Sequence, residues 1–275
     1  MSDLRIEPIN FHGTPCIRLH GEGGASASVA LHGGQVLSWI PADGRERLFL
    51  GKRARFEAGA AIRGGIPVIF PQFGERGELV KHGFARNLPW HFIGADQQAV
   101  FGLVDNEATA YWPHAFATRL HVALTADALD VTLEIENTGD RPFIFSAALH
   151  TYLRVHDLDG VTLEGLQGCD YEDSAAGGTL HRENDFELRF EGEIDRIYND
   201  VVAPLTLRDG MHSLHIEQEG FPDAVIWNPG AALANSIGDL ASGEHRNFVC
   251  VEAGQVLQPE LLHPGDTWTG TQHLR

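Results

Sequence analysis

Hydrophobic and polar residues alternate with a period of two along much of the chain. The clearest run is TRLHVALTADALDVTLEIENTGDRPFIFSAALHTYLRV, residues 118–155, in which LHVALT and LDVTLEI alternate and TADA separates them. NTGDRP then supplies turn residues before FIFSAALHTYLRV. Alternation of β-branched and aromatic residues, bounded by Gly, Pro, Asn and Asp, is typical of half-buried strands. This stretch therefore predicts three consecutive strands.

The same alternation recurs in the C-terminal half, in SLHIEQEG, AVIWNP and NFVCVEAGQVL. No amphipathic helical stripe of useful length stands out, although GKRARFEAGAA and ANSIGDL could each form one or two helical turns. Many short strands with frequent turns indicate an antiparallel sandwich or barrel. The sequence contains no linker, low-complexity tract or clear repeat. We therefore predict an all-β fold in which residues 1–275 form a single domain.

Composition and charge narrow the range of partners. The 275 residues are 43% hydrophobic, which suffices for a sizeable core, and the formal net charge is -18 at pH 7. An acidic surface argues against nucleic acid or an anionic membrane as a partner, because phosphate backbones require a basic face. It still permits a small anion held by a local group of arginines.

Cysteine usage and the N-terminus indicate the compartment. Three widely spaced cysteines without a CxxC motif favour free thiols in a reducing compartment over a disulfide or metal framework. The N-terminal MSDLRIEPIN is polar and lacks the apolar core of a signal peptide, and no run reaches the length of a membrane span. We expect a soluble, cytoplasmic protein.

One segment, IRGGIPVIFPQFGERGELVKHGFARNLPW at residues 62–90, concentrates glycine, proline, aromatic and cationic residues. If HGFARN is extended, His82 and Arg86 share one face with their Cα atoms about 13 Å apart, and Lys81 points to the other face. Such a spacing could straddle a small ligand that has one anionic end. Arg63 precedes two glycines that allow close backbone approach, and it adds a second guanidinium.

The two arginines have two competing interpretations. Two guanidinium groups aimed at one point suit a phosphate or a carboxylate, because each planar fork donates two hydrogen bonds. The alternative is that Arg63 and Arg86 form ordinary ion pairs with some of the 38 acidic residues. The sequence leaves these interpretations level.

Two strand positions carry groups suited to proton transfer. By alternation, His150 shares a face with Ser146, Ala148 and Tyr152, and the small residues leave room beside the imidazole. A lone histidine in a strand is more often a structural residue. Glu252 ends an apolar run, so we expect at least partial burial, which raises a carboxyl pKa and suits it to proton exchange near neutrality. A glutamate that faces water at a strand end is the alternative.

Other candidates carry a weaker signal. Trp227 in VIWNP could stack on the apolar face of a sugar ring, but a core tryptophan is the commoner fate. Asp195 in EGEIDRIYND is the least distinctive of the set. His212, His215 and Glu217 have the composition of a metal site, but strand residues three apart point to opposite faces. We therefore predict no metal site there.

Six motifs occur in an order that resembles the aldose 1-epimerase (mutarotase) superfamily, and within it the hexose-6-phosphate mutarotase branch. They are RGGIPVIFPQFG, KHGFARNLPW, ALHTYLRV, DRIY, VIWNP and VCVEAGQV, between residues 62 and 257. Each motif alone is weakly specific, but six in register argue against chance. The resemblance implies a large antiparallel β-sandwich of the galactose-mutarotase type. It also implies interconversion of α and β anomers without a cofactor.

The resemblance further assigns roles to single residues. His150 resembles the acid that protonates the ring oxygen, and Glu252 resembles the base that takes the proton from the C1 hydroxyl. The remaining matches resemble substrate-binding residues: His82 at sugar or ring oxygens, Asp195 at sugar hydroxyls, Arg63 and Arg86 at the phosphate, and Gln72 and Trp227 in the pocket. Two positions depart from the family pattern, because relatives often have an aromatic residue in place of Gln72 and a proline in place of Ala253.

Three other functions stay open on the sequence alone: a mutarotase of unphosphorylated aldoses, a non-catalytic sugar-binding module on the same sandwich, and a metal-dependent cupin-like enzyme. The paired arginines argue against the first. The presence of both His150 and Glu252 argues against the second. We expect a small phosphosugar as substrate, a monomeric protein, and no requirement for a metal or cofactor.

Overall fold

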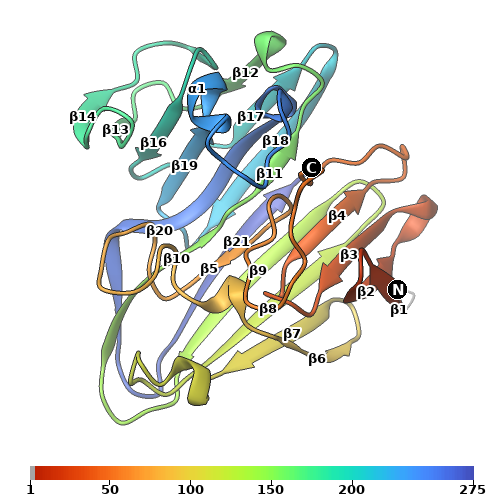
Figure 1. Cartoon of the computed structure of the whole chain (residues 1–275), viewed down its shortest axis with the longest axis vertical. Helices are drawn as coiled ribbons and strands as arrows, with labels where there is room; N and C mark the ends of the chain where they lie inside the picture. The colour runs from red at the N-terminus through yellow and green to blue at the C-terminus, as the bar shows by residue number, and fades with distance from the viewer. Residues whose placement is uncertain (1–3) are drawn as a thin grey trace.

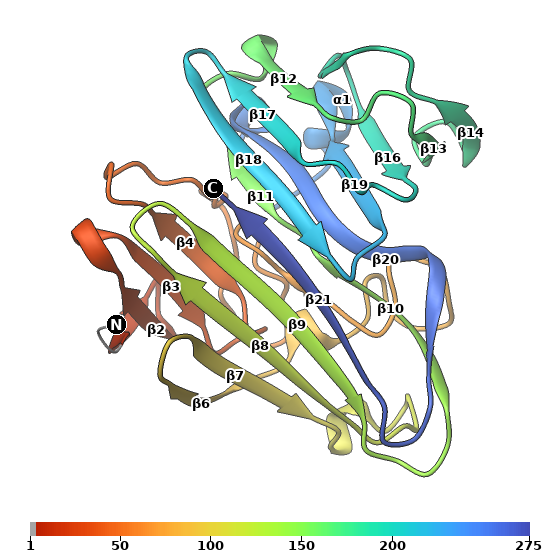
Figure 2. The ribbon, with the colours of Figure 1, turned by 180° about the vertical axis from the view of Figure 1, so that it is seen from behind.

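The structure of the protein is a computed structural model that describes residues 4–275. It consists mainly of antiparallel strands arranged in three sheets of four, eight and nine strands (Figures 1 and 2). The two larger sheets face each other across a shared core. The prediction of an antiparallel all-β sandwich is therefore confirmed.

The nine-stranded sheet follows the period-two pattern most closely, because buried and half-buried residues alternate without interruption along β8 and β9. Figure 2 shows its long strands as one layer. In spatial order the strands are β15 (Glu187–Arg189), β12 (Val161–Glu164), β17 (Leu205–Asp209), β18 (His212–Glu219), β21 (Thr267–Leu274), β9 (Leu129–Asn137), β8 (Phe116–Leu124), β7 (Ala99–Val104) and β6 (His91–Ala95).

The eight-stranded sheet forms the second layer and is seen from its outer side in Figure 1. In spatial order its strands are β14 (Thr179–Arg182), β13 (Asp170–Asp173), β16 (Ile194–Tyr198), β19 (Asp223–Asn228), β20 (Phe248–Leu262), β10 (Phe143–Leu149) and β5 (Val68–Ile69), and β11 (Tyr152–Arg154) also pairs with β20. Of the three strands predicted for residues 118–155, the first two are confirmed as β8 and β9, whereas the third, expected to be continuous, is divided at His150 and Thr151 into β10 and β11.

The N-terminal sheet is a four-stranded antiparallel meander that lies beside β8 in both views (Figures 1 and 2). Its strands are β1 (Arg5–Phe11), β2 (Thr14–His20), β3 (Ser26–Ala30) and β4 (Val36–Ile40). The main hydrophobic cluster draws on all three sheets and includes Val29 of β3, Leu133 of β9 and Val251 of β20. All three sheets therefore share one core.

The two faces of the eight-stranded sheet have different environments. Ala147, Leu149 and Val251 point into the main core, whereas Ala148 and Cys250 belong to smaller clusters on the outer face. This alternation agrees with the faces expected from the sequence. Polar side chains can therefore lie on the outer face of this sheet, between the two small apolar clusters. The strands that form this part of the face are β10, β11, β16, β19 and β20.

Helices are short and few, and the expected helical turns are misplaced. Residues 52–61 form turns and bends instead of a helix. The only α-helix of residues 4–275 is α1 (Gly230–Ala234), which ends where ANSIGDL begins. The remaining helical segments are 3-10 turns: η1 (Glu22–Gly24), η2 (Ala85–Asn87), η3 (Glu107–Thr109), η4 (Leu158–Gly160) and η5 (Glu244–Asn247). No helix of residues 4–275 has the length and apolar character of a membrane span.

Candidate active site

A cavity of about 520 Å³ opens on the outer face of the eight-stranded sheet. Its volume lies in the range of small-molecule sites, which is about 300–1,000 Å³. Seven of the eight residues predicted to form the site line it, and Gln72 does not: the seven are Arg63, His82, Arg86, His150, Asp195, Trp227 and Glu252. Residues nearly 190 positions apart in sequence therefore meet in one cavity.

Strand register brings most of these side chains to one face. Asp195 of β16 lies opposite Trp227 of β19, and Trp227 lies opposite Cys250 of β20. One step along the sheet, Val225 lies opposite Glu252. Directly opposed residues of antiparallel strands point to the same side of the sheet. Two adjacent rows of side chains thus form the floor of the cavity.

His150 joins this floor from the turn between β10 and β11. The pairs Leu149–Ala253 and Tyr152–Cys250 flank it, and this register carries its side chain to Glu252. Its backbone N–H donates to the carbonyl of Pro67, 3.0 Å away, so the segment before β5 fixes the turn.

His150 and Glu252 form a buried acid–base pair. The Nε2 atom of His150 lies 3.3 Å from Oε1 of Glu252. The two residues are only 7% and 1% exposed. Nδ1 of His150 and Oε2 of Glu252 have no hydrogen-bond partner among residues 4–275. A buried polar atom without a hydrogen-bond partner destabilises the folded protein. These two atoms are therefore positions at which a bound ligand could supply the missing hydrogen bonds.

Burial and neighbouring charges shift the protonation of this pair. Burial lowers the pKa of His150 well below its ordinary value, and the guanidinium groups of Arg86 and Arg63 lower it further. Burial raises the pKa of Glu252 well above its ordinary value, and the carboxylate of Asp195 raises it further. Burial thus disfavours the charged form of each group, and the guanidinium of Arg86 acts in the opposite sense on Glu252 by lowering its pKa.

His82 lines the cavity, but the segment that carries it is not extended as the sequence suggested. His82 and Gly83 have φ angles of 68° and 66°, and η2 follows within two residues. The correction has a physical cause: a Cβ atom on Gly83 would lie 2.3 Å from the carbonyl oxygen of Phe70. Only glycine permits that approach, and the chain turns there. His82 and Arg86 face the same cavity because of this turn, and the argument from alternation was wrong.

The turn also changes the interpretation of Lys81. We expected this side chain on the opposite face, whereas Lys81 lines the cavity with His82 and Arg86. The missed signal was the His-Gly pair, because a glycine after histidine marks a break in a strand pattern. Lys81 is therefore an additional cation of the site.

His82 is held as a neutral hydrogen-bond donor. Its Nδ1 accepts a hydrogen bond from the backbone N–H of Gly74 at 3.3 Å, so Nε2 carries the proton in the neutral ring. Burial lowers the pKa of His82 well below its ordinary value, and the charge of Arg86 lowers it further. The ring centroid lies 5.5 Å from that of His150. A ligand in the cavity would meet an N–H donor beside the acid–base pair.

The two predicted arginines differ in their partners. Arg63 donates from Nε to Asp239 at 3.1 Å and from Nη1 to the hydroxyl of Tyr152 at 2.8 Å. Arg86 forms no ion pair with any residue of 4–275, and its Nη2 donates only to the carbonyl of Lys81, at 3.0 Å. Its Nε is buried without a partner. The ion-pair interpretation thus describes Arg63, whereas Arg86 has no such partner among residues 4–275.

Tyr152 connects Arg63 to the buried pair of His150 and Glu252. The rings of Tyr152 and His150 are stacked, with centroids 4.9 Å apart and planes inclined by 9°. Tyr152 is 2% exposed, and its hydroxyl is fixed by Arg63. The chain Asp239–Arg63–Tyr152 therefore restricts the orientation of the His150 imidazole.

Asp195 and Trp227 form the wall next to Glu252. The carboxylate of Asp195 has no hydrogen-bond or ion-pair partner among residues 4–275, and burial raises its pKa. The indole of Trp227 lies edge-on to His150, with centroids 6.1 Å apart. A free carboxylate beside an aromatic ring suits a ligand that has hydroxyl groups and an apolar face.

Gln72 supports the loop over the cavity from behind. Its Nε2 donates to the carbonyls of Gly74 and Leu79, both at 3.1 Å, and its Oε1 accepts from the N–H of Leu79 at 2.9 Å. The expected contact with a ligand has no geometric support, because these three hydrogen bonds occupy the amide. At its other end the loop is tied to β13 by an ion pair between Arg76 and Glu172.

One group of residues has the composition of a metal site. His150, Cys250 and Glu252 offer ligand atoms within 4.8 Å of one another, a set that Zn²⁺ accepts in other proteins. Burial raises the pKa of Cys250 well above its ordinary value, so the thiol stays protonated. The charges of Arg63 and Arg86, which disfavour an imidazolium at His150, also disfavour a divalent cation. The protonated thiol and the two neighbouring cations therefore make this group a poor fit for a metal ion.

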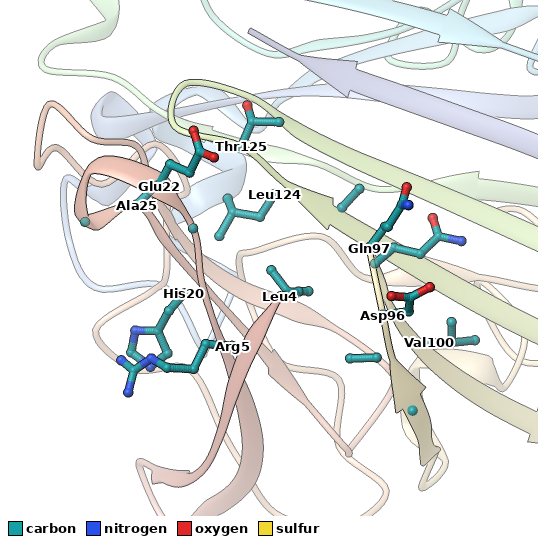
Figure 3. A pocket seen from close by; sticks show the side chains of 16 residues that line it. Leu4, Arg5, His20, Glu22, Ala25, Asp96, Gln97, Val100, Leu124 and Thr125 are labelled. Atoms are coloured by element: carbon teal, nitrogen blue, oxygen red, sulfur yellow. The ribbon is translucent and has the colours of Figure 1, made fainter. Parts of the chain in front are cut away.

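A larger hollow, of about 1280 Å³, lies near the N-terminal sheet and is shown in Figure 3. Arg5 and His20 come from β1 and β2, and Asp96 and Gln97 come from the turn after β6. No ion pair joins two of its lining residues within the described chain. None of the predicted site residues lines it, so the smaller cavity is the candidate active site.

An antiparallel sandwich with a sugar-sized cavity and a buried histidine–glutamate pair defines a class of protein: enzymes that transfer protons on a small polar substrate. Comparison with known families is more specific. The sequence profile described as Aldose 1-epimerase matches residues 15–275. The chain belongs to the aldose 1-epimerase family, and it is an isomerase of that family, as the resemblance implied.

Individual relatives agree with this assignment. The chain is 38% identical over 268 residues to a protein of Cenchrus ciliaris named "Putative glucose-6-phosphate 1-epimerase", covering 92% of this chain and 82% of that protein. A protein of Escherichia coli K12 with the same name is 37% identical over 253 residues, with coverages of 86% and 82%. A Salmonella typhimurium protein (YeaD) whose crystal structure is described as that of a mutarotase superposes on this chain with a TM-score of 0.89. The two sequences are 29% identical, and the superposition covers 99% of this chain and 92% of that one.

Proposed function

We propose that the protein interconverts the α and β anomers of a hexose 6-phosphate, with glucose 6-phosphate as the leading candidate. One observation carries the choice of a phosphorylated sugar. Arg86 is a half-buried guanidinium without an acidic partner among residues 4–275, in a chain of net charge -18, and it shares a cavity with a buried acid–base pair. A partly buried guanidinium without an acidic partner favours binding of an anion, because the anion supplies the missing charge-assisted hydrogen bonds.

The proposed chemistry needs one acid and one base. His150 donates a proton to the ring oxygen as the C1–O5 bond breaks, and Glu252 takes the proton of the C1 hydroxyl as the carbonyl forms. Rotation about C1–C2 presents the other face of the aldehyde, and ring closure reverses both transfers. The two side chains are 3.3 Å apart, so both can contact the oxygen atoms bonded to one carbon.

The remaining side chains bind the substrate in this proposal. His82 donates from Nε2 to a sugar oxygen, Asp195 accepts from sugar hydroxyls, and Trp227 covers an apolar face of the ring. Arg86 and Lys81 bind the phosphate, and Arg63 adds its Nη2, which is not used by Asp239 or Tyr152. Gln72 is left without a direct role toward the substrate.

We further propose a monomeric, cytoplasmic enzyme that needs neither cofactor nor metal. The three cysteines are free thiols, as a reducing compartment allows. The net charge of -18 disfavours binding to nucleic acid or anionic membranes. Sedimentation at enzyme concentrations used for assays would test the monomer, and activity after dialysis against a chelator would test the independence from metal.

Anomer exchange measured by NMR tests the choice of substrate. We expect the purified protein to accelerate exchange of glucose 6-phosphate far more than that of glucose. Arg86→Ala should raise KM for glucose 6-phosphate about tenfold or more, as expected for loss of a charge-assisted hydrogen bond worth about 1.5–3 kcal/mol. KM for glucose should change little.

Arg53→Ala is a matched control, because Arg53 is exposed and lies outside the cavity. Equal effects of Arg86→Ala on both sugars would exclude the phosphate site and favour a mutarotase of unphosphorylated aldoses. Binding of either sugar without exchange would favour the non-catalytic module.

A further inference from the structure

We infer that Tyr152 is a positioning residue whose ring sets the plane of the His150 imidazole, and that Asp239 acts through Arg63 to hold Tyr152 in place. This inference rests on the proposed function, in which His150 is the acid. Neither Tyr152 nor Asp239 lines the cavity, so neither would touch the substrate. Their effect should therefore appear in the rate of the chemical step and not in the affinity for the substrate.

The imidazole of His150 has a single polar contact within residues 4–275. The backbone of His150 is fixed, because its N–H donates to the carbonyl of Pro67. On the ring, Nε2 lies 3.3 Å from Glu252, whereas Nδ1 is buried without a hydrogen-bond partner in the described chain. A second hydrogen bond at the other ring nitrogen commonly orients a catalytic histidine. One polar contact leaves the ring free to tilt about Nε2, so packing must fix its plane.

Tyr152 is the aromatic neighbour that lies parallel to this imidazole. The two ring centroids are 4.9 Å apart, and the planes are inclined by 9°. His82 and Trp227 meet the imidazole edge-on, at 5.5 Å with planes inclined by 69° and at 6.1 Å with planes inclined by 80°. A parallel ring in contact opposes a tilt of the imidazole, because one edge would be pressed into it. Tyr152 thus sets the plane of the imidazole, and Glu252 sets which edge meets the carboxylate.

Tyr152 is in turn held by packing and by one hydrogen bond. It is 2% exposed and belongs to an apolar cluster with Phe49, Leu240 and Phe248. Its ring centroid lies 5.3 Å from that of Phe248 and 6.4 Å from that of Phe49. Its hydroxyl accepts a hydrogen bond from Nη1 of Arg63 at 2.8 Å. Because a buried hydroxyl without a partner is unfavourable, this hydrogen bond ties the end of the ring to Arg63.

Asp239 fixes the guanidinium of Arg63 from the connection between α1 and η5. Its Oδ1 accepts a hydrogen bond from Nε of Arg63 at 3.1 Å. Its carbonyl oxygen would lie 3.1 Å from a Cβ atom on Gly51, and the N–H of Gly51 donates to the carbonyl of Arg63 at 3.0 Å. The connection therefore packs closely against the segment that carries Arg63. With Nε and Nη1 both engaged, the planar guanidinium is held in one orientation toward Tyr152.

Removal of the Tyr152 ring tests its role directly. Tyr152→Leu should lower kcat for glucose 6-phosphate about tenfold or more, because a small misplacement of the acid slows the chemical step. KM should change by less than about twofold. Tyr152→Phe keeps the ring and should restore most of the rate, with a loss of about threefold for the missing hydrogen bond. Phe145→Leu is the control, because it makes a similar hole in the main core and should retain the wild-type kcat.

A double-mutant cycle tests whether Asp239 acts through Tyr152. Asp239→Asn should lower kcat about threefold, as expected for a weakened hydrogen bond, without raising KM for glucose 6-phosphate. In the Tyr152→Phe protein, Arg63 has no hydroxyl to hold, so Asp239→Asn should have no further effect on kcat. Additive losses, or a raised KM with an unchanged kcat, would overturn the role inferred for Asp239. The cycle makes no hole in the core, so it decides the question even if Tyr152→Leu does not fold.

The orientation of the imidazole can be measured without any assay of activity. In ligand-free protein with ¹³C-labelled histidine, the carbon-bound protons of the His150 ring should resonate upfield, because they lie over the shielding face of Tyr152. Tyr152→Phe should keep this shift, and Tyr152→Leu should lose it. Phe145→Leu should leave it unchanged, and His150→Gln assigns the resonances.

The outcomes separate the inference from the proposed function. If glucose 6-phosphate is turned over but Tyr152→Leu retains the wild-type kcat or the upfield shift, the inference is overturned and the proposed function stands. A loss of kcat that Tyr152→Phe does not restore, or that Phe145→Leu shares, also overturns it, because the ring would then act only on the fold. If glucose 6-phosphate is not turned over, both fail.

Discussion

In the proposed mechanism His150 and Glu252 act as a pair, because one supplies the acid and the other the base at the same carbon atom. Each is buried beyond what an isolated ionisable group tolerates, and each has one atom without a partner in residues 4–275. Stability alone would favour replacement of both residues together by well-packed apolar side chains. Their retention in the floor of a cavity is what a functional site predicts.

Substitution of either residue tests the roles given by the proposed mechanism. We expect His150→Ala and Glu252→Gln each to reduce anomer exchange of glucose 6-phosphate by about a hundredfold or more, the usual contribution of general acid or base catalysis. Glu252→Gln is nearly isosteric, so its fold should be intact. Exchange NMR measures the rate, and thermal unfolding checks the fold.

His215→Ala is the matched control for these variants, because His215 is an exposed strand residue far from the cavity lining. A folded His150→Ala protein that retains the wild-type rate would remove His150 from the mechanism.

At the scale of elements, the cavity is built from a rigid floor and a looped wall. The floor follows strand register, which fixes Asp195, Trp227 and Glu252 to within the tolerance of a hydrogen-bonded sheet. The wall is the loop of residues 73–84, which carries Lys81 and His82 and pairs with another segment only at the isolated bridge between Gly83 and Phe70. Its position also depends on turn hydrogen bonds and on a few side-chain contacts, so loss of those contacts is expected to loosen it.

The hydrogen bonds between Gln72 and this loop can be tested most directly. We predict that Gln72→Ala raises KM for glucose 6-phosphate by loosening the loop, with a loss of about 1–3 kcal/mol for the buried groups left unpaired. Hydrogen exchange distinguishes this role from direct binding, because a support holds the loop in the ligand-free protein. The N–H of Leu79, which donates to Gln72, should lose protection without ligand.

Gly77→Ala offers a second variant, because a Cβ atom there would lie 2.3 Å from Oε1 of Gln72 and displace the same amide. Gln97→Ala, at an exposed turn, is the control. Unchanged exchange at Leu79 in both variants would argue that Gln72 acts on the substrate itself.

At the scale of the whole molecule, the protein is strongly acidic, whereas its cavity is lined by equal numbers of cationic and acidic side chains. Four of the 20 lysines and arginines line one small cavity, where four acidic residues balance them: the cations are Arg63, Arg76, Lys81 and Arg86, and the acids are Glu75, Glu193, Asp195 and Glu252. The rest of the surface carries the excess of -18. The cavity is therefore far less acidic than the rest of the protein, which the proposed binding of a small anion requires.

Burying titratable groups also makes global stability depend on pH. His82 is neutral when folded, so acidification below its ordinary pKa of 6.5 favours the unfolded chain, which binds more protons. Glu252 has the opposite sign: above its ordinary pKa of 4.5 the folded state holds the proton more tightly, and stability is lost as pH rises through the folded pKa.

Between pH 4.5 and 6.5, substitution of each residue should remove its own contribution to the pH dependence of the free energy of unfolding. His82→Gln should flatten the loss of stability on acidification by up to about 1.4 kcal/mol per pH unit, and Glu252→Gln should steepen it. Urea unfolding across this window measures both, and His215→Gln is the control. Parallel pH profiles for wild type and both variants would contradict the burial of these groups as ionisable side chains.

Alternation along the sequence was enough to determine the sandwich, the faces of β10 and β20, and the burial of Glu252, because a strand has one side-chain period and one buried face. It failed at Lys81 and His82, where Gly83 turns the chain, and it gave no information on Gln72, whose hydrogen bonds are made to a loop. Which arginine stays unpaired was also beyond the sequence, since Asp239 reaches Arg63 from 176 residues away. Pairing between distant segments is decided by tertiary packing, and it is this packing that left Arg86 free to meet an anion.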